Sequence, residues 1–546
     1  MENNELENEI RVFGPPGTGK TTWVSGSVRA TAKLRATSRI MVASFTRTAA
    51  TEIAGRGLPL EREQIGTLHA LAYRSIGRPA VAQEHMKEWN SEFPSMALSG
   101  GRRNIEDESP QPEGGDSPGD EVMSQVEVLR ARMIPEELWP SARARYFNKK
   151  WSEWKKSNGV VDFTDMISDA LEYGEAPGNP VVGYFDEVQD FTPLELALVR
   201  HWGKNMDKVV LAGDDDQCIY SFKGASPDAF LDPPLPESQK RLLDKSYRLP
   251  KAVHASSQQW VERLTRREPK DYHPRDEEGL VRTAPTLYWR DGETVARQIT
   301  KLADEGRSVM VLATCSYMLD RVKHALRAEG IPFHNPYRRS RGDWNPLQGG
   351  RGISAAEKVL SYMVLDERLF PGRSRSWTGP DIQAWSSLIR HRGILQRGAA
   401  KMIAALPDRE LTYDEVAALF LNEEDLEQAV EPSLPWLRSK LLASSGFANY
   451  PITVAEKRGP DALESLPRVT IGTIHSVKGG EADVVLLFPD LSLAGSRSWE
   501  QPGIARDSVI RQMYVGMTRA REELWVCQPS SPLSVDPHLL TGRIRG

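Results

Sequence analysis

Short runs of apolar residues, each followed by polar or glycine-rich positions, recur along the chain. They lie at 10–13, 40–45, 181–185, 209–212, 309–313, 469–474 and 484–488. A continuous apolar run of this length is typical of a strand buried on both faces of a parallel sheet. Helix-length segments such as 317–329 separate the runs. The pattern therefore predicts βα units and an α/β fold class.

The predicted strands form two groups, one before and one after about residue 240. The proline-rich stretch at 231–236 lies between them and suits an interdomain hinge. Two largely helical stretches, 78–159 and 341–455, interrupt the α/β rhythm. Residues 100–121 are rich in Gly, Pro, Ser and acidic residues, which cannot bury a core, so we expect a flexible loop there.

Composition excludes several classes of protein. The chain has 546 residues and a net charge of −5, with 39% hydrophobic and 27% charged residues, as in globular proteins. Its apolar runs are far shorter than the roughly 18 residues of a membrane span, and its acidic N-terminus does not resemble a secretory signal. The three cysteines are too few and too scattered for a disulfide framework or a zinc site. We expect a soluble, cytoplasmic, multidomain protein without a membrane partner.

The clearest chemical signature directly follows the first predicted strand. Gly14, Gly19, Lys20 and Thr21 have the spacing of a P-loop. Glycines let backbone N–H groups surround phosphate oxygens, the lysine neutralises phosphate charge, and the threonine hydroxyl can bind Mg²⁺. The sequence therefore predicts a nucleotide and Mg²⁺ site, with the loop residues Gly14, Pro15, Pro16, Gly17, Thr18, Gly19, Lys20, Thr21 and Thr22.

A second strand, at 181–185, ends in the adjacent acids Asp186 and Glu187. We expect Asp186 to hold Mg²⁺ together with Thr21, and Glu187 to orient or deprotonate the attacking water. A lone Asp-Glu pair is usually a solvated strand end. The P-loop earlier in the chain favours the catalytic interpretation.

Further motifs follow in a fixed order. DEVQD at 186–190, GDDDQCIYSFKGA at 213–225 and SYR at 246–248 resemble helicase motifs II, III and IV of the UvrD/Rep family of superfamily one. The wording GPPGTGKT is also common in the other branch of that superfamily, which moves 5′→3′, but motif III here lacks that branch's GD-x-x-QLPP. The remaining segments that resemble the family are 43–56, 66–74, 161–166, 469–488 and 511–526.

The resemblance implies two RecA-like P-loop domains with parallel sheets, each carrying a mainly helical insertion, and the use of ATP with Mg²⁺. Gln217 would sense the γ-phosphate, and Arg248 and Arg519 would reach it as arginine fingers, a device worth about 10³–10⁵ in rate. Tyr247 would stack on adenine and Glu481 would contact the ribose. The implied limits are 1–77 with 160–240 for the first domain, 78–159 for its insertion, 241–340 with 456–546 for the second domain, and 341–455 for its insertion.

The family reads adenine with a glutamine upstream of the P-loop. Residues 1–13 contain no glutamine, although Asn3, Asn4 or Asn8 offers a similar amide. Stacking alone accepts any purine. We therefore expect weak discrimination between ATP and GTP.

Six family positions that contact single-stranded DNA correspond here to Phe45, Thr67, His69, Tyr220, Phe222 and His475. Phe222 stands where the family commonly has a tryptophan. The phenylalanine ring keeps a stacking face, but one of smaller area. Each base stacked on an aromatic ring contributes about 1–3 kcal/mol. An isolated Phe or His is more often a core residue, but placement in the motifs favours DNA contact.

Basic and aromatic residues also alternate outside the motifs, over 130–158. This stretch is either a DNA-contacting helical face or a solvated helix with core aromatics, and the sequence leaves both interpretations open. The same alternatives stay open for the arginine-rich stretch 338–401. The residues are Arg130, Arg132, Arg143, Arg145, Lys149, Lys150, Lys155 and Lys156, with Trp139, Tyr146, Phe147, Trp151 and Trp154.

We therefore expect an ATP-dependent DNA helicase or translocase that moves 3′→5′ on single-stranded and tailed duplex DNA. One alternative is a translocase with little unwinding, because both insertions are shorter than in larger family members. The other is a P-loop module that binds DNA only to recruit other proteins. The presence of Lys20, Glu187, Gln217 and Arg519 argues against it.

Overall fold

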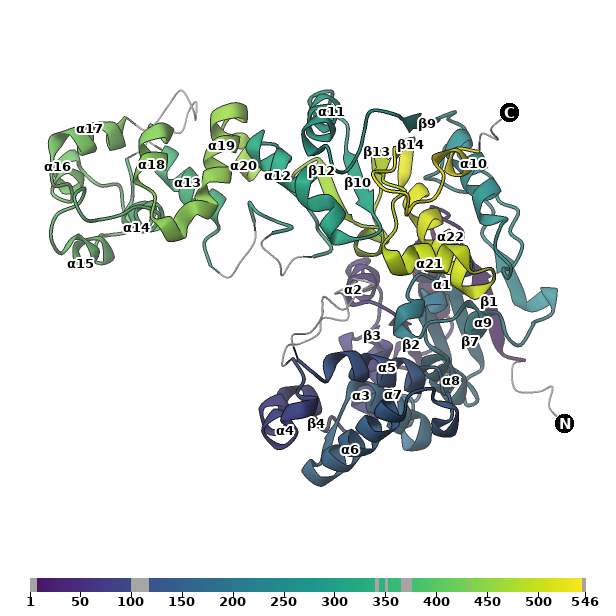
Figure 1. The fold of residues 1–546 in the computed structure, drawn as a ribbon. Helices are drawn as coiled ribbons and strands as arrows, with labels where there is room; N and C mark the ends of the chain where they lie inside the picture. The colour runs from purple at the N-terminus through teal and green to yellow at the C-terminus, as the bar shows by residue number, and fades with distance from the viewer. Residues whose placement is uncertain are drawn as a thin grey trace. The chain divides into compact units, whose positions relative to one another are not determined.

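A computed structural model describes residues 7–99, 117–338, 343–348, 352–364, 376–431 and 433–542 (Figure 1). Most of the predicted loop 100–121, and parts of the arginine-rich stretch 338–401, lie outside these ranges. The chain divides into two compact units. Unit 1 comprises Met1–Arg282, Leu491–Leu524 and Leu533–Gly546, and unit 2 comprises Thr283–Asp490 and Trp525–Pro532.

Unit 1 is built on a six-stranded sheet of order β3-β2-β6-β7-β1-β8. Neighbouring strands pair in parallel. Loops at the carboxyl ends of parallel strands therefore meet at one edge, where α/β proteins bind their ligands. The strands are β1 (Glu9–Phe13), β2 (Ile40–Ser44), β3 (Ile65–Thr67), β6 (Val182–Asp186), β7 (Lys208–Gly213) and β8 (Lys240–Leu242).

Helices cover both faces of this sheet, which explains why its strands are apolar throughout. In β6, Phe185 packs into the core on one face and the preceding Tyr184 into the core on the other, as the two-residue period of a strand requires. The helices are α1 (Lys20–Ala32), α2 (Arg47–Gly55), α3 (Leu68–Ser75), α7 (Phe163–Tyr173), α8 (Pro193–Gly203) and α9 (Pro227–Leu231), whereas α10 (Lys251–Val261) contributes to neither core.

The first insertion is a small helical subdomain with an aromatic core. Trp151 stacks on Trp154 and meets Trp89 edge-on, with ring centroids 5.2 and 4.9 Å apart. Trp139 and Phe147 are also buried, so these aromatics are core residues, whereas Tyr146 is 57% exposed. The elements are β4 (Ala80–Val81), α4 (Met86–Glu92), α5 (Asp120–Ala131), α6 (Ala142–Asn158) and β5 (Val160–Val161).

Two of the predicted DNA-contacting cations, the buried Lys155 and the half-buried Arg130, form ion pairs within the protein. Lys155 Nζ lies 2.5 Å from Asp162 Oδ2, and Arg130 Nη1 lies 2.9 Å from the same oxygen. Although burial opposes ionisation, these two cations hold the pKa of Asp162 well below its usual range. The exposed cations of α6 are Arg143, Lys149 and Lys156.

A second six-stranded sheet has the order β11-β12-β10-β13-β14-β9, and most of its strands belong to unit 2. β10 pairs in parallel with β12 and β13, and β11 with β12. Helices α11 (Gly292–Asp304) and α12 (Asp320–Ala328) follow the first strands. The strands are β9 (Leu280–Ala284), β10 (Val309–Ala313), β11 (Phe333–His334), β12 (Val469–Thr473), β13 (Ala482–Leu487) and β14 (Ala520–Cys527).

The second insertion is helical, as expected, and is drawn in green in Figure 1. Its core includes Tyr362, which stacks against Trp377 and Trp436. Its helices, with those that lead back to the sheet, are α13 (Ala355–Met363), α14 (Gly379–Ser386), α15 (Ala399–Ala404), α16 (Tyr413–Ala417), α17 (Glu423–Val430), α18 (Leu434–Lys440), α19 (Asn449–Arg458) and α20 (Asp461–Glu464). The predicted fold class, two RecA-like domains with helical insertions, is confirmed.

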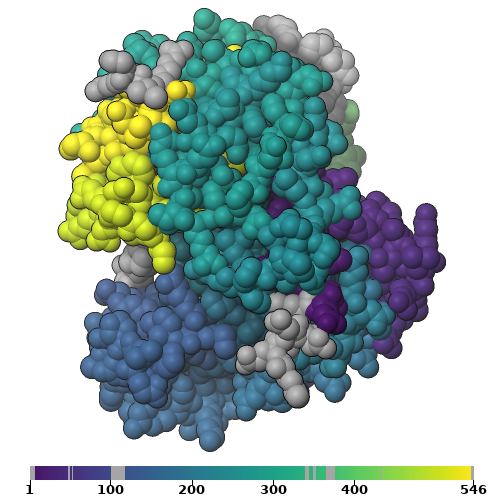
Figure 2. All heavy atoms as spheres, turned by 90° about the vertical axis from the view of Figure 1, so that its right-hand side faces the viewer, coloured from purple at the N-terminus to yellow at the C-terminus, as the bar shows by residue number. Residues whose placement is uncertain are grey.

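The compact units differ from the predicted domain limits. Unit 1 also includes residues 241–282 and three later helices, α21 (Leu493–Glu500), α22 (Ile504–Met517) and α23 (Pro537–Leu540). Trp260 of α10 donates to the Ile510 carbonyl at 2.9 Å, and the Thr265 hydroxyl donates to Asp507 at 2.6 Å. Figure 2 shows all heavy atoms of the chain from a second direction, coloured by residue number. Among the described residues, no helix is long and apolar enough to cross a membrane.

Candidate functional site

The P-loop has the backbone conformation that its glycines allow. Gly17 and Gly19 adopt φ of +75° and +76°, a left-handed region that favours glycine. A Cβ atom at Gly17 would lie 2.4 Å from the Cβ of Arg248, so this position also lacks space for a side chain. Helix α1 begins after Gly19 without a capping side chain, which leaves its first amides to a phosphate.

Hydrogen bonds fix the remainder of the loop. The Thr18 hydroxyl donates to the Pro15 carbonyl at 2.8 Å, and the Gly14 amide donates to the Gly213 carbonyl at 2.9 Å. The Thr22 hydroxyl accepts from Arg56 at 2.9 Å. The loop is therefore tied to the end of β7.

Lys20 is buried beside the acids at the end of β6. Its Nζ lies 3.0 Å from Glu187 Oε1. Burial lowers the pKa of Lys20, but the charges of Glu187, Asp186 and Asp214 outweigh it and raise the pKa above its ordinary value. Lys20 is therefore charged, as phosphate binding requires, and neutralises Glu187 in this structure.

Thr21 and Asp186 present oxygen atoms to one point, because the hydroxyl donates to Asp186 Oδ2 at 2.9 Å. Burial and the charge of Glu187 raise the pKa of Asp186 to about 6. A hydroxyl beside a buried carboxylate is the donor set that Mg²⁺ prefers, so these residues fit the expected metal. Glu187 follows with φ of +57°, a strained conformation for a residue with a side chain, of the kind found at functional sites.

Gln189 links these acids to motif III. Its Nε2 donates to Glu187, and its Oε1 accepts from the Asp214 amide at 2.9 Å. A Cβ at Gly213 would lie 2.7 Å from that Oε1, so the glycine makes room for the amide.

The sensor Gln217 and the finger Arg519 are in direct contact. Gln217 Nε2 donates to Asp214 Oδ2 at 2.7 Å, and its Oε1 accepts from Arg519 Nη2 at 3.0 Å. Arg519 is buried and also donates to the Val515 carbonyl at 2.9 Å. Gln217 and Arg519, two of the residues expected at the γ-phosphate, thus form one hydrogen-bonded chain with Asp214.

Motif IV lies on the P-loop. The Ser246 hydroxyl donates to the Pro16 carbonyl, and the Tyr247 amide donates to the Gly17 carbonyl, both at 2.8 Å. The Tyr247 side chain is 74% exposed, so its face is available for stacking. Arg248 Nη1 lies 3.5 Å from the Thr518 carbonyl.

The aromatic residues expected to contact DNA form a cluster in which one ring is covered. The Phe45 ring lies 5.2 Å from that of Tyr220, and the Tyr220 ring lies 6.0 Å from that of Phe222. Tyr220 is only 1% exposed, whereas Phe45 and Phe222 are partly exposed. The expectation that Tyr220 stacks on a base therefore needs correction, because its neighbours cover its ring, and Tyr220 supports the rings beside it.

Thr67 and His69 lie at the start of α3. The Thr67 hydroxyl accepts from the Ala70 amide at 3.2 Å and caps the helix, and His69 Nδ1 lies 3.4 Å from Glu195 Oε1. Thr67 and His69 therefore both make contacts within the protein, in addition to any contact with DNA. His475 and Glu481 belong to unit 2, where His475 is buried in the turn after β12 and Glu481 is exposed before β13.

Asn8 does not have a free amide to read a base. Its Nδ2 donates to the carbonyls of Gly203 and Met206 at 2.8 and 2.7 Å. These bonds hold the end of α8, so the suggestion that Asn8 replaces the adenine-reading glutamine is wrong in this structure. Asn3 and Asn4 lie outside the described residues.

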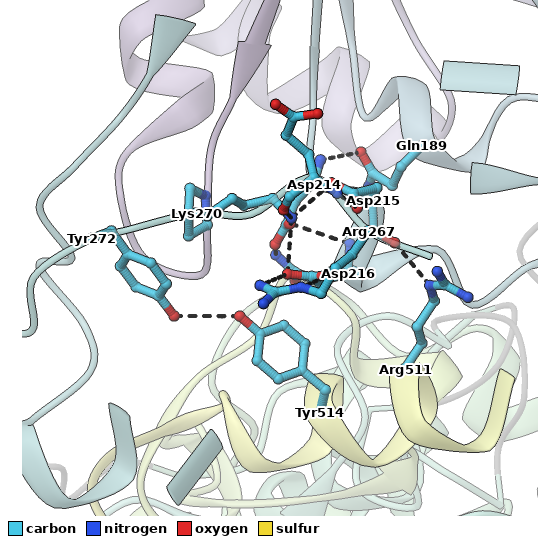
Figure 3. A network of polar contacts seen from close by, with 12 residues as sticks. Gln189, Asp214, Asp215, Asp216, Arg267, Lys270, Tyr272, Arg511 and Tyr514 are labelled. Carbon is cyan, nitrogen blue, oxygen red and sulfur yellow. Dashed lines mark hydrogen bonds and ion pairs between the residues drawn. The ribbon is translucent and has the colours of Figure 1, made fainter. Parts of the chain in front are cut away.

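Sequence reasoning missed a buried ionic cluster beside the site. Lys270 Nζ lies 3.2, 2.7 and 2.8 Å from carboxylate oxygens of Asp214, Asp215 and Asp216 (Figure 3). Arg267 also contacts Asp216 Oδ2, at 2.6 Å. The available signal was the run of three acids after an apolar strand, because buried charges require partners.

Comparison with known proteins agrees with the motifs. Residues 2–233 match the UvrD/REP helicase N-terminal domain. ATP-dependent DNA helicase UvrD2 of Mycobacterium tuberculosis (strain ATCC 25618 / H37Rv) is 24% identical over 94% of this chain and 76% of its own length. ATP-dependent DNA helicase PcrA of Staphylococcus aureus (strain NCTC 8325 / PS 47) is 22% identical over 68% of this chain and 59% of its own length. The comparisons confirm the resemblance to the UvrD/Rep family: residues 2–233 match the UvrD/REP helicase N-terminal domain, and most of the chain is similar to an ATP-dependent DNA helicase.

Proposed function

We propose that the protein is an ATP-dependent DNA helicase that moves 3′→5′ on single-stranded DNA and couples hydrolysis to strand separation. One observation carries this proposal. Gln217, bonded to Arg519, lies in the same short loop as the Tyr220 and Phe222 rings. A change at the nucleotide therefore has a direct covalent path to the Phe222 ring, which would grip a base with Tyr220 supporting it.

In this proposal the P-loop amides and Lys20 bind the β- and γ-phosphates of ATP. Thr21 and Asp186 would hold Mg²⁺, which supplies positive charge to the phosphate oxygens when bound. Phosphates that draw Lys20 away from its 3.0 Å contact release Glu187 to orient the attacking water. Gln217, Arg519 and Arg248 then stabilise the charge that develops on the γ-phosphoryl group.

ATP hydrolysis measured with and without single-stranded DNA tests the motor against a recruitment module. We expect DNA to stimulate hydrolysis strongly, and a rate that DNA does not change would contradict the proposal. Displacement of streptavidin from the same DNA, compared with strand separation, distinguishes a helicase from a translocase that barely unwinds.

Phe222→Ala should uncouple hydrolysis from movement. At saturating single-stranded DNA we expect ATPase activity within about twofold of wild type but translocation reduced at least about tenfold, because one stacking contact of about 1–3 kcal/mol is lost. Tyr173→Ala, which removes a 64% exposed ring from α7, is the matched control. If stopped-flow assays showed an unchanged translocation rate for Phe222→Ala, Phe222 would be a packing residue rather than a DNA contact.

Tyr247→Ala should raise KM for ATP and for GTP by the same factor, about tenfold, because stacking does not distinguish purines. We expect kcat to remain within about twofold, since this ring lies at the base rather than at the γ-phosphate. Steady-state kinetics with both nucleotides provides the measurement. A loss confined to ATP would show that Tyr247 also reads the base edge.

A further inference from the structure

The buried cluster around Lys270 contains more acid than base. Three consecutive carboxylates, those of Asp214, Asp215 and Asp216, converge on one ammonium group, and Asp216 also pairs with the guanidinium of Arg267 (Figure 3). All three acids are fully buried. Buried charges of this kind are retained only where they are paired and hydrogen-bonded, so the two cations determine where the three carboxylates point.

One of these carboxylates determines the orientation of Gln217. A side-chain amide has a donor end and an acceptor end, and a carboxylate can only accept. Because Asp214 Oδ2 accepts from Gln217 Nε2 at 2.7 Å, the Gln217 oxygen faces the other way, toward Arg519 Nη2 at 3.0 Å. The second oxygen of Asp214 lies 3.2 Å from Lys270.

The segment that carries Lys270 is also fixed to α22. The Arg266 carbonyl accepts from Arg511 Nη2 at 2.8 Å, and the Tyr272 hydroxyl lies 3.3 Å from that of Tyr514 (Figure 3). Arg511 Nε also donates to the Asp215 carbonyl at 3.0 Å. The same helix ends just before Arg519, so one rigid element holds both the Lys270 segment and the finger.

We propose that Lys270 is a positioning residue for the hydrolysis proposed above: through Asp214 it holds the Gln217 amide in the orientation that receives Arg519. Lys270 does not touch the nucleotide in this account. Its loss leaves the P-loop intact but allows the Asp214 carboxylate to turn, and a turned carboxylate no longer presents Oδ2 as the acceptor for Gln217 Nε2.

Asp215 provides a control and a means of preserving charge balance. Its carboxylate lies 2.7 Å from Lys270 Nζ and accepts from the Glu268 amide at 2.9 Å. Burial, together with the charges of Asp214 and Asp216, raises its pKa to about 6 despite Lys270. Asp215→Asn keeps the acceptor for Glu268 but turns its NH2 group toward Lys270, so it serves as the control only together with Lys270→Met, where that ammonium is absent.

The test compares DNA-stimulated kcat and KM for ATP in Lys270→Met, Lys270→Arg and the charge-balanced pair Lys270→Met/Asp215→Asn, with melting temperatures as a check on folding. We expect kcat of the balanced pair to fall about tenfold while KM stays within about twofold, since a displaced catalytic group affects the transition state. Lys270→Arg should recover most of the activity, because arginine also pairs with carboxylates.

Combination with Gln217→Ala separates positioning from a general structural effect. If Lys270 acts through Gln217, the balanced pair combined with Gln217→Ala is no slower than Gln217→Ala alone. Wild-type kcat in the balanced pair, or losses that multiply in the combination, would overturn the inference and leave the proposed function standing. A wild-type protein without DNA-stimulated hydrolysis would overturn both.

Discussion

Lys20→Ala is expected to reduce DNA-stimulated ATP hydrolysis by at least about a thousandfold, because it removes the ammonium that neutralises phosphate charge in a buried site. Lys20 is buried and 3.0 Å from Glu187, with Asp186 close by. Without it, several buried negative groups would face the negative phosphates. Both nucleotide binding and turnover should therefore fail.

Affinity for single-stranded DNA should stay within about threefold of wild type, since the aromatic cluster lies outside the P-loop. Lys33→Ala, at the exposed end of the same helix, is the matched control and should hydrolyse ATP normally. Fluorescence anisotropy with labelled DNA and a coupled ATPase assay provide both measurements. Near wild-type turnover in Lys20→Ala would show that the nucleotide site has been misassigned.

Arg519→Ala should reduce kcat by about 10³-fold or more while ATP affinity changes by about threefold or less, because a finger acts mainly on transition-state charge. The guanidinium is buried and its Nη2 lies 3.0 Å from Gln217, beside the expected γ-phosphate position. Its Nε also donates to the Val515 carbonyl, which holds it against α22.

Arg521→Ala is the control for Arg519, since it removes an exposed arginine two residues away. Single-turnover hydrolysis and equilibrium binding of a nucleotide analogue separate the two effects. Equal losses of affinity and rate in Arg519→Ala would identify a ground-state phosphate clamp instead. Such a result would also remove the reason for proposing that Lys270 acts through the contact between Gln217 and Arg519.

Local patterns were sufficient to predict the parts of the site that lie at strand ends. The P-loop and the Asp186–Glu187 pair follow buried apolar strands, and parallel pairing brings such ends to one edge of a sheet. The same patterns predict the α/β fold with helical insertions, and the structure confirms it. The P-loop spacing identified Gly17 and Gly19, whose left-handed backbone conformation few other residues adopt.

Tertiary packing determined the contacts and the burial that the local patterns did not predict. Lys270 is more than fifty positions from Asp214 and belongs to no recognised motif, so only the folded chain reveals their contact. Tyr220 and Trp151 are aromatic residues of the kind that often contact nucleic acids, yet their neighbours bury them. Asn8 likewise has the right amide, but helix α8 uses it. Burial depends on partners that are distant in sequence, which a local pattern does not contain.

Strand separation on duplexes with a single 3′ or 5′ tail, in the presence of ATP and Mg²⁺, tests the central claim most directly. We predict that wild type separates the 3′-tailed duplex at a rate that depends on ATP, that the 5′-tailed duplex stays paired, and that Lys20→Ala separates neither. Separation of the 5′-tailed duplex alone, or hydrolysis of ATP without separation of either duplex, would contradict the proposal of a 3′→5′ helicase.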